Sequence, residues 1–80
     1  MDPFYFVGQI VLLPLSFTPK KFALCDGRLL SITGYVALFS LISNKFGGDG
    51  LRTFALPDYR AIAPTGSGYY IALEGIFPTP

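Results

Sequence analysis

The sequence contains no histidine, no tryptophan and only one cysteine. Histidine is the usual general base near neutral pH and the commonest metal ligand, so its absence removes the central member of most catalytic sites. A single cysteine excludes an internal disulfide and the cysteine-rich zinc patterns. We therefore expect no enzyme, no metal site and no cofactor. Cys25 is interpreted as a small buried hydrophobe rather than as half of a disulfide between copies.

Charged residues are also scarce. They make up 14% of the 80 residues, whereas hydrophobic residues make up 51%. An ordinary soluble domain carries about 25% charged residues, and a chain of this length buries only about 60% of its unfolded surface. The sequence therefore predicts one domain, residues 1–80, whose excess apolar surface contacts copies of itself, another partner or a membrane.

The few charges exclude further classes. The net charge is +1 and the six basic residues form no stripe, so we expect no nucleic acid partner. Lys20-Lys21 is interpreted as a solvated corner rather than an anion site. The longest uncharged run, 3–19, is broken by Gly8 and Pro14, whereas a membrane-spanning helix needs roughly 20 mostly apolar residues. No membrane insertion is expected, although a small pore-forming peptide, detectable by vesicle leakage, is an open alternative.

One segment, 31–44, has the periodicity of an α-helix. Tyr35, Leu38, Phe39 and Ile42 recur at the spacing of one helix face. Ser31 or Thr33 is the expected N-cap, and the glycines at 47 and 48 favour termination. The remaining surface is apolar or small rather than charged. Such a helix is expected to be covered nearly all round, which in so short a chain can require more than one copy.

Short extended segments surround this helix. Residues 4–13 are β-branched and aromatic and end at Pro14, so they predict a strand; strict alternation is missing, which favours cover on both faces. Residues 22–30 predict a hairpin, because Asp26-Gly27 suits a type I′ turn. Residues 51–56 are a further short strand, and residues 69–73 with 76–77 are a last strand pair or one bent strand, after a link at 65–68. The fold class is α+β: a strand-rich domain with several short strands and a single central α-helix.

The carboxylates suggest no reaction. Asp49 and Asp58 are the pair from which a hydrolase could be drawn, but no spacing rule selects them. Residues 48–50 offer one oxygen ligand where calcium loops readable from sequence offer several. The loop at 47–50 also lacks the Gly-Lys-Ser/Thr of a phosphate-binding loop. A tight glycine-rich turn is the expected structure.

Four sequence blocks then follow one another in a distinctive order: Phe22–Leu30, Ala37–Ile42, Phe46–Gly50 and Thr53–Arg60. Their order and spacing resemble the phage tail collar domain family, which includes the microcystin-dependent proteins. The resemblance covers roughly residues 7 to 62, and residues 69–78 resemble the end of short members. It implies a small strand-rich domain of tail fibres and related surface proteins, in which copies associate, often as trimers. It implies no catalytic residues.

The departures from the family pattern lower the charge of the chain and shorten the segment that follows the Leu-Pro-Asp block. Phe22 stands where family members commonly have Trp, Ala61-Ile62 where they have Gly-Arg, and Gln9 and Val11 where the first strand often carries Glu and Arg. The segment after the Leu-Pro-Asp block is cut to residues 65–68. A receptor-binding head would need a displayed loop there. The resemblance therefore favours a reduced subunit whose surface contacts copies of itself.

The leading hypothesis is a structural subunit of an extracellular or phage-tail-like filament, polymerising through apolar strands near both ends of the chain. These strands are expected to supply unpaired edges. We expect these interface side chains: Phe4, Phe6, Val11, Leu13, Tyr69, Ile71, Ile76 and Phe77. The alternative is a receptor- or glycan-binding tail-tip module, a closed trimer that binds a cell-surface glycan through exposed Tyr59, Tyr69 and Tyr70. Asp2 and Pro3 replace the positive start of a signal peptide, so no signal peptide is recognisable, and the expected location is extracellular or on a virion or tail-like particle.

Overall fold

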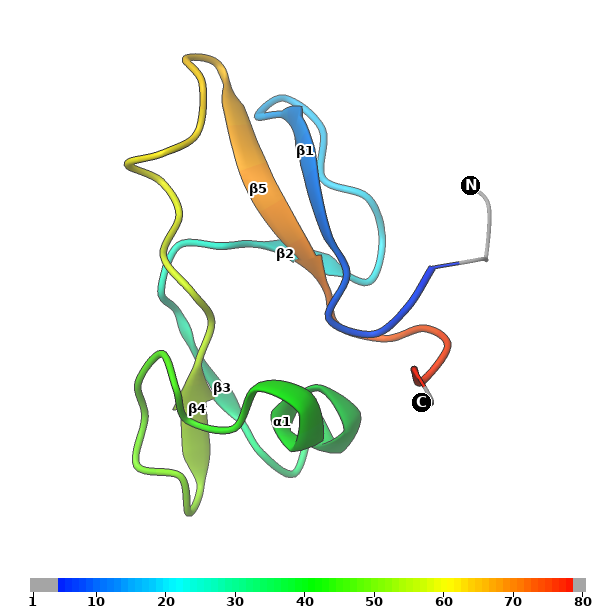
Figure 1. Cartoon of the computed structure of the whole chain (residues 1–80), viewed down its shortest axis with the longest axis vertical. Coiled ribbons are helices and arrows are strands. Elements are labelled where there is room, and N and C mark those ends of the chain that lie inside the picture. Colours follow the sequence, from blue (N-terminus) through cyan, green and yellow to red (C-terminus); the bar gives the residue numbers. More distant parts are fainter. Residues whose placement is uncertain (1–4, 79–80) are drawn as a thin grey trace.

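A computed structural model of the chain describes residues 5–78. It contains two small antiparallel sheets and one helix, α1 (Figure 1). The first sheet has the strand order β1-β5-β2, and the second pairs β3 with β4. The bounds are β1 Ile10–Pro14, β2 Phe22–Leu24, β3 Leu29–Ser31, α1 Val36–Ile42, β4 Thr53–Ala55 and β5 Ser67–Ala72. The predicted α+β, strand-rich fold with a single helix is confirmed.

The first sheet carries apolar side chains on both faces, because β5 lies at its centre. Ile71 packs on one face with the helix residue Leu38 and with Phe54 of β4. Tyr70 packs on the opposite face against Phe22. Successive residues of a strand point to opposite faces, so a single strand supplies the centre of both clusters. Figure 1 shows the second sheet and α1 together at one end of the molecule, with the first sheet at the other.

The predicted hairpin at 22–30 is wrong. Its first arm, β2, pairs with β5, and its second arm, β3, pairs with β4. Gly27 does adopt a positive φ of 82°, as the turn signal requires. Asp26, however, forms an isolated bridge with Asp58, so the chain passes from one sheet to the other here. Long-range pairing that buries Phe22 and Ala23 outweighs the local preference for a two-residue turn.

The helix is shorter than predicted, and neither proposed N-cap caps it. Ser31 belongs to β3, and its Oγ accepts a hydrogen bond from the Gly34 N–H at 3.1 Å, which closes a turn before the helix. Tyr35 is the N-cap residue and no side chain caps the helix. The helix ends at Ser43, whose φ is 51° and whose N–H donates to the Phe39 carbonyl. The predicted inner face is confirmed, since Leu38 is fully buried and Phe39 packs on Phe54.

The strand expected at 4–13 begins only at Ile10 in the described residues. Gly8, with a φ of 83°, and Gln9 form a bulge-like step, because the Gly8 N–H donates to the Ala72 carbonyl while Gln9 accepts from the Ala72 N–H. Within residues 5–78, the predicted cover on both faces is incomplete, since Ile10 and Leu12 are exposed. The predicted link at 65–68 also ends early, because Ser67 already belongs to β5.

Candidate functional site

Segments near the two ends of the chain meet at an exposed apolar surface. Phe6 and Ile76 form an isolated parallel bridge. The Val7 N–H donates to the Ile76 carbonyl at 3.0 Å, and the Ile76 N–H donates to the Tyr5 carbonyl at 2.9 Å. Phe6, Ile76 and Phe77 remain 50%, 45% and 48% exposed. We name these three residues the terminal apolar surface.

The other predicted interface residues are distributed differently. Val11 and Leu13 are half-buried and pack against the cluster around Tyr70. Tyr69 is half-buried and packs edge-to-face on Tyr59, with ring centroids 6.0 Å apart. Ile71 is 1% exposed and belongs to the core of its own chain. Phe4 lies outside the described residues.

Terminal strands with unpaired edges were expected, and only one of the two has one. β5 is hydrogen-bonded on both sides, to β1 and to β2, so the prediction is wrong for the C-terminal strand. β1 is paired on one side only. The C-terminal segment around Ile76 instead contributes to the terminal apolar surface by pairing with Phe6.

Further apolar side chains are exposed besides the predicted interface residues. On β1, Ile10 and Leu12 are 40% and 46% exposed. On α1, Val36 and Leu41 lie outside the buried face and are exposed, so the chain itself does not give the helix cover all round. Ile10 and Leu12 alternate with Val11 and Leu13 in the sequence, but all four are apolar, so the pattern alone could not tell the outer pair from the inner pair.

The charged residues contribute little to these surfaces, because four of them neutralise each other in pairs. Arg28 donates through Nε and Nη2 to the two carboxylate oxygens of Asp26, each at 3.0 Å. Arg60 does the same to Asp58, at 2.9 and 2.7 Å. The Arg28 guanidinium lowers the pKa of Asp26, and the Arg60 guanidinium lowers the pKa of Asp58 to about 2. Both carboxylates are therefore ionised and engaged at neutral pH, unlike a general acid.

The glycine-rich loop uses its carboxylate to hold its own backbone. Asp49 Oδ1 accepts hydrogen bonds from the N–H groups of Leu51, Arg52 and Thr53 at 2.8, 2.9 and 3.0 Å. These bonds lower the pKa of Asp49 to about 2. Within residues 5–78, no three or more His, Cys, Asp or Glu side chains gather as a metal site would require. The arrangement explains Asp49 as a structural cap of the loop.

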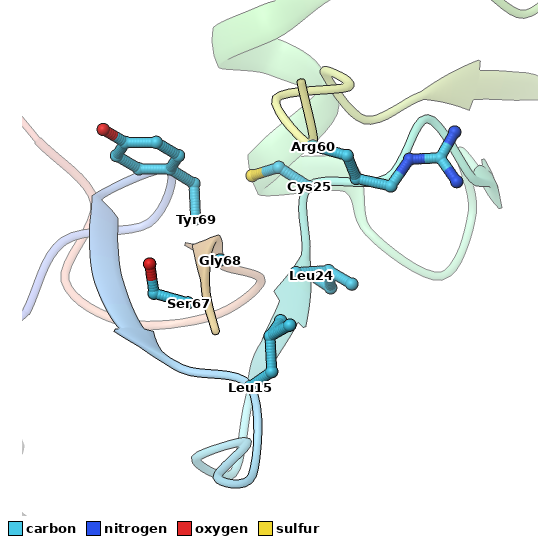
Figure 2. Close-up of a pocket in the computed structure, with 7 residues that line it drawn as sticks. All are labelled: Leu15, Leu24, Cys25, Arg60, Ser67, Gly68 and Tyr69. Atoms are coloured by element: carbon cyan, nitrogen blue, oxygen red, sulfur yellow. The ribbon is translucent and has the colours of Figure 1, made fainter. Parts of the chain in front are cut away.

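A pocket of about 250 Å³ is lined by residues of β2 and β5 together with Leu15, Cys25 and Arg60 (Figure 2). Its lining is mostly apolar and includes Leu15, Leu24, Cys25, Gly68 and Tyr69. In Figure 2 the Cys25 sulfur points to the side on which Tyr69 lies, and the Arg60 guanidinium points the other way. Burial, and then the nearby Asp26 carboxylate, raise the pKa of the Cys25 thiol to about 11. The thiol is therefore protonated at neutral pH and is a poor nucleophile.

The aromatic platform of the glycan hypothesis is not formed as expected. Tyr70 is 2% exposed and lies in the core, so the prediction that it is exposed is wrong. Tyr59 and Tyr69 are half-buried against each other. A stacking surface would have to use the remaining exposed part of this pair.

The comparison with family models decides the relationship. The model of the phage tail collar domain matches residues 8–64, more than two thirds of the chain. This chain belongs to the phage tail collar domain family. A collar domain is a structural part of phage tail fibres, so membership indicates a structural role and an association with a phage tail or virion. No curated protein and no solved structure matches the chain. Among the described residues of this collar domain, no helix is long and apolar enough to cross a membrane.

Proposed function

We propose that this collar domain is a self-assembling structural subunit of a phage-tail-like or extracellular filament, whose copies contact one another through exposed apolar surface. The terminal apolar surface carries the proposal. Phe6 and Ile76 bridge each other, Phe77 follows Ile76 in the sequence, and all three are about half exposed. Burying a fully exposed side chain of this size contributes about 1.5–3 kcal/mol. These three are already about half buried, so roughly half of that amount per side chain is left for a contact between copies.

The wider surface supports the same conclusion. Exposed large hydrophobic residues occur on β1, on α1 and in the loops, while four of the charges are held in local pairs. Charges and prolines are the usual means by which soluble monomers prevent association. A chain with few charges and this much exposed apolar area is suited to a surface buried by its own copies.

The alternative, a closed trimer that binds a cell-surface glycan, has weaker support. Aromatic stacking on a sugar needs open ring faces. Tyr70 has none exposed, and Tyr59 and Tyr69 cover part of each other. We therefore keep copies of the chain, rather than a glycan, as the principal proposed partner.

Sedimentation velocity and negative-stain microscopy of the purified chain test this proposal. We expect concentration-dependent assemblies, and we expect Phe77→Ser to raise the concentration needed for assembly by roughly four- to tenfold, because a contact loses about 0.8–1.4 kcal/mol of apolar burial. Leu51→Ser is the matched control, since Leu51 is 85% exposed but lies in the loop before β4. Dispersed monomers of the wild-type chain at micromolar concentration would refute the proposal. Equal effects of the two substitutions would refute the role of the terminal apolar surface.

A further inference from the structure

The hydrogen-bonding pattern of β1 shows which of its residues face away from the sheet. At one end of the ladder the Ala72 N–H donates to the Gln9 carbonyl, and at the other the Leu15 N–H donates to the Gly66 carbonyl. In an antiparallel pair, residues alternate between facing the partner strand and facing away from it. Residues 9, 11, 13 and 15 therefore face β5. Residues 10, 12 and 14 direct their backbone groups to the outer edge.

Two of these outer residues keep both backbone groups open. Pro14 has no N–H, and its carbonyl accepts a bond from the Phe17 N–H at 3.2 Å. No hydrogen bond within the described residues engages the N–H or the carbonyl of Ile10 or of Leu12. Each therefore presents one free donor and one free acceptor. The two residues lie two positions apart, so these groups point in the same direction.

The other edges are closed or smaller. On β2, the Phe22 N–H donates to the Pro19 carbonyl and the Leu24 carbonyl accepts from the Asp26 N–H. On β4, the glycine-rich loop bonds to the outer groups, for example from the Ala55 N–H to the Gly47 carbonyl. β3 is open but only three residues long, and it follows Arg28, a charge of the kind that discourages pairing. β1 is five residues long and lies in the uncharged run 3–19.

We propose that β1 pairs antiparallel with β1 of a second copy, with Ile10 opposite Leu12 of that copy and a two-fold axis at Val11. This inference rests on the proposed function, because it names the partner and one contact of the assembly. In this register every open group of Ile10 and Leu12 finds a partner in the other copy. Pro14, which cannot donate, falls beyond the paired residues.

The side chains suit the same register. Ile10 and Leu12 lie on one face of the sheet, and both are partly exposed. In the proposed pair Ile10 of one copy lies beside Leu12 of the other, and apolar cross-strand neighbours of this kind stabilise a sheet. One sheet then runs continuously through both copies.

A two-fold contact closes after two copies. A filament therefore requires a second, different contact, and the terminal apolar surface is available for it because its residues are not on β1. The assembly unit is then a dimer joined through β1. Such dimers associate further through Phe6, Ile76 and Phe77.

Cross-linking between copies tests the register directly. Val11 lies opposite its own equivalent in a non-hydrogen-bonded pair, where Cα atoms are about 4.5 Å apart, a distance that a disulfide spans. In a Cys25→Ala background, we expect Val11→Cys to form a disulfide-linked dimer on mild oxidation with diamide. Leu13→Cys is the matched control: it points to the same face, but the two copies of position 13 lie more than about 13 Å apart in this register. It should remain uncross-linked.

A second variant tests the backbone pairing without a new thiol. Leu12→Pro removes an N–H that faces outward, so the bonds of β1 to β5 are kept, and edge strands tolerate proline at such positions. We expect it to abolish the dimer in sedimentation velocity while circular dichroism shows the native fold. If the wild-type chain assembles but Val11→Cys does not cross-link, or Leu12→Pro assembles unchanged, the β1 contact is refuted and the proposed function stands. Equal cross-linking at positions 11 and 13 refutes the register. Wild-type monomers refute both.

Discussion

Asp26 and Asp58 lie opposite each other in an isolated antiparallel bridge, and each accepts three hydrogen bonds from the arginine two residues later in the chain, one from its backbone N–H and two from its guanidinium. The same short arrangement thus occurs twice, side by side, where the chain passes between the two sheets. The Tyr59 N–H donates to the Cys25 carbonyl at 2.9 Å, which ties the two segments together. The bridge joins parts of the chain that are 32 residues apart in numbering.

The loop held by Asp49 should make stability depend on acidic pH. Its folded-state pKa is about 2, below the ordinary value of 3.8, because three backbone N–H groups bind the ionised carboxylate. The ionised form therefore favours folding. Its contribution is fully present above about pH 4 and is lost as the pH falls towards about 2.

Urea unfolding followed by circular dichroism between pH 2 and pH 6 measures this contribution. Asp49→Asn keeps an acceptor oxygen but cannot ionise, so we expect it to be less stable than the wild type at pH 6 and to lose less stability on acidification. Parallel pH curves for the two proteins would contradict the assignment. The pKa of Asp58 is also lowered to about 2, and that of Asp26 is lowered by Arg28, so the wild-type curve includes further contributions that remain in this variant.

Gly48 should be irreplaceable for a steric reason. Its φ is +88°, and a Cβ there would lie 2.5 Å from the Phe54 Cα and 2.7 Å from the Thr53 carbonyl oxygen. We expect Gly48→Ala to destabilise the fold by about 2–4 kcal/mol, from the strained backbone and the clash with backbone atoms together.

Gly66→Ala is the matched control for this substitution. Gly66 has nearly the same φ, +82°, but a Cβ added there would meet nothing within 4 Å. Only the backbone strain of about 1–2 kcal/mol should remain. Thermal and urea unfolding of the two variants measure the difference, and equal losses of stability would show that the contact with β4 is not responsible.

The two faces of α1 should respond differently to truncation. Leu38 is fully buried among the core residues, whereas Leu41 is 37% exposed. At concentrations low enough to avoid association, we expect Leu38→Ala to cost about 2–5 kcal/mol and Leu41→Ala less than about 1.5 kcal/mol, since part of its side chain already contacts water. Urea titration checks both values. A reversed order would mean that the helix packs through its other face.

Cys25 should react slowly with thiol reagents. It is 1% exposed, and its pKa is raised to about 11 by burial and by Asp26. Little thiolate is therefore present at pH 8, and a reagent reaches the sulfur only when the chain opens locally. We expect labelling by a disulfide reagent such as Ellman's reagent to be slow in the native chain and complete within seconds in guanidinium chloride. Rapid labelling of the native protein would place the thiol at the surface.

The sequence was sufficient to predict features that depend on local residue patterns, and to suggest the family through several sequence blocks in a matching order. The inner helix face at Leu38 and Phe39 and the glycine loop before β4 followed from residue spacing, and the family relationship from the resemblance of four sequence blocks. It was insufficient where one strand could pair with either of two others, as β2 could with β3 or β5. The turn propensity of Asp26-Gly27 is real, but β2 gains more by covering β5 than by pairing with β3.

For the candidate site, the sequence proposed Phe6, Ile76 and Phe77, which are about half exposed, and also Ile71, which is buried. An apolar side chain looks the same in the sequence whether it faces the core or the solvent, and β5 is apolar throughout its centre. The sequence likewise could not predict which residues of β1 are exposed, because Ile10, Val11, Leu12 and Leu13 are all apolar.

By itself, the amino-acid composition determined that this chain has too few charges and too much apolar area to cover itself, because an 80-residue chain has a high ratio of surface to volume. Only the tertiary structure decided which apolar residues stay outside. Strand register assigns each residue of β1 and β5 to one face, and hydrogen bonding to β5 leaves the groups of Ile10 and Leu12 open. Both are consequences of pairing between residues more than fifty positions apart, which no local pattern specifies.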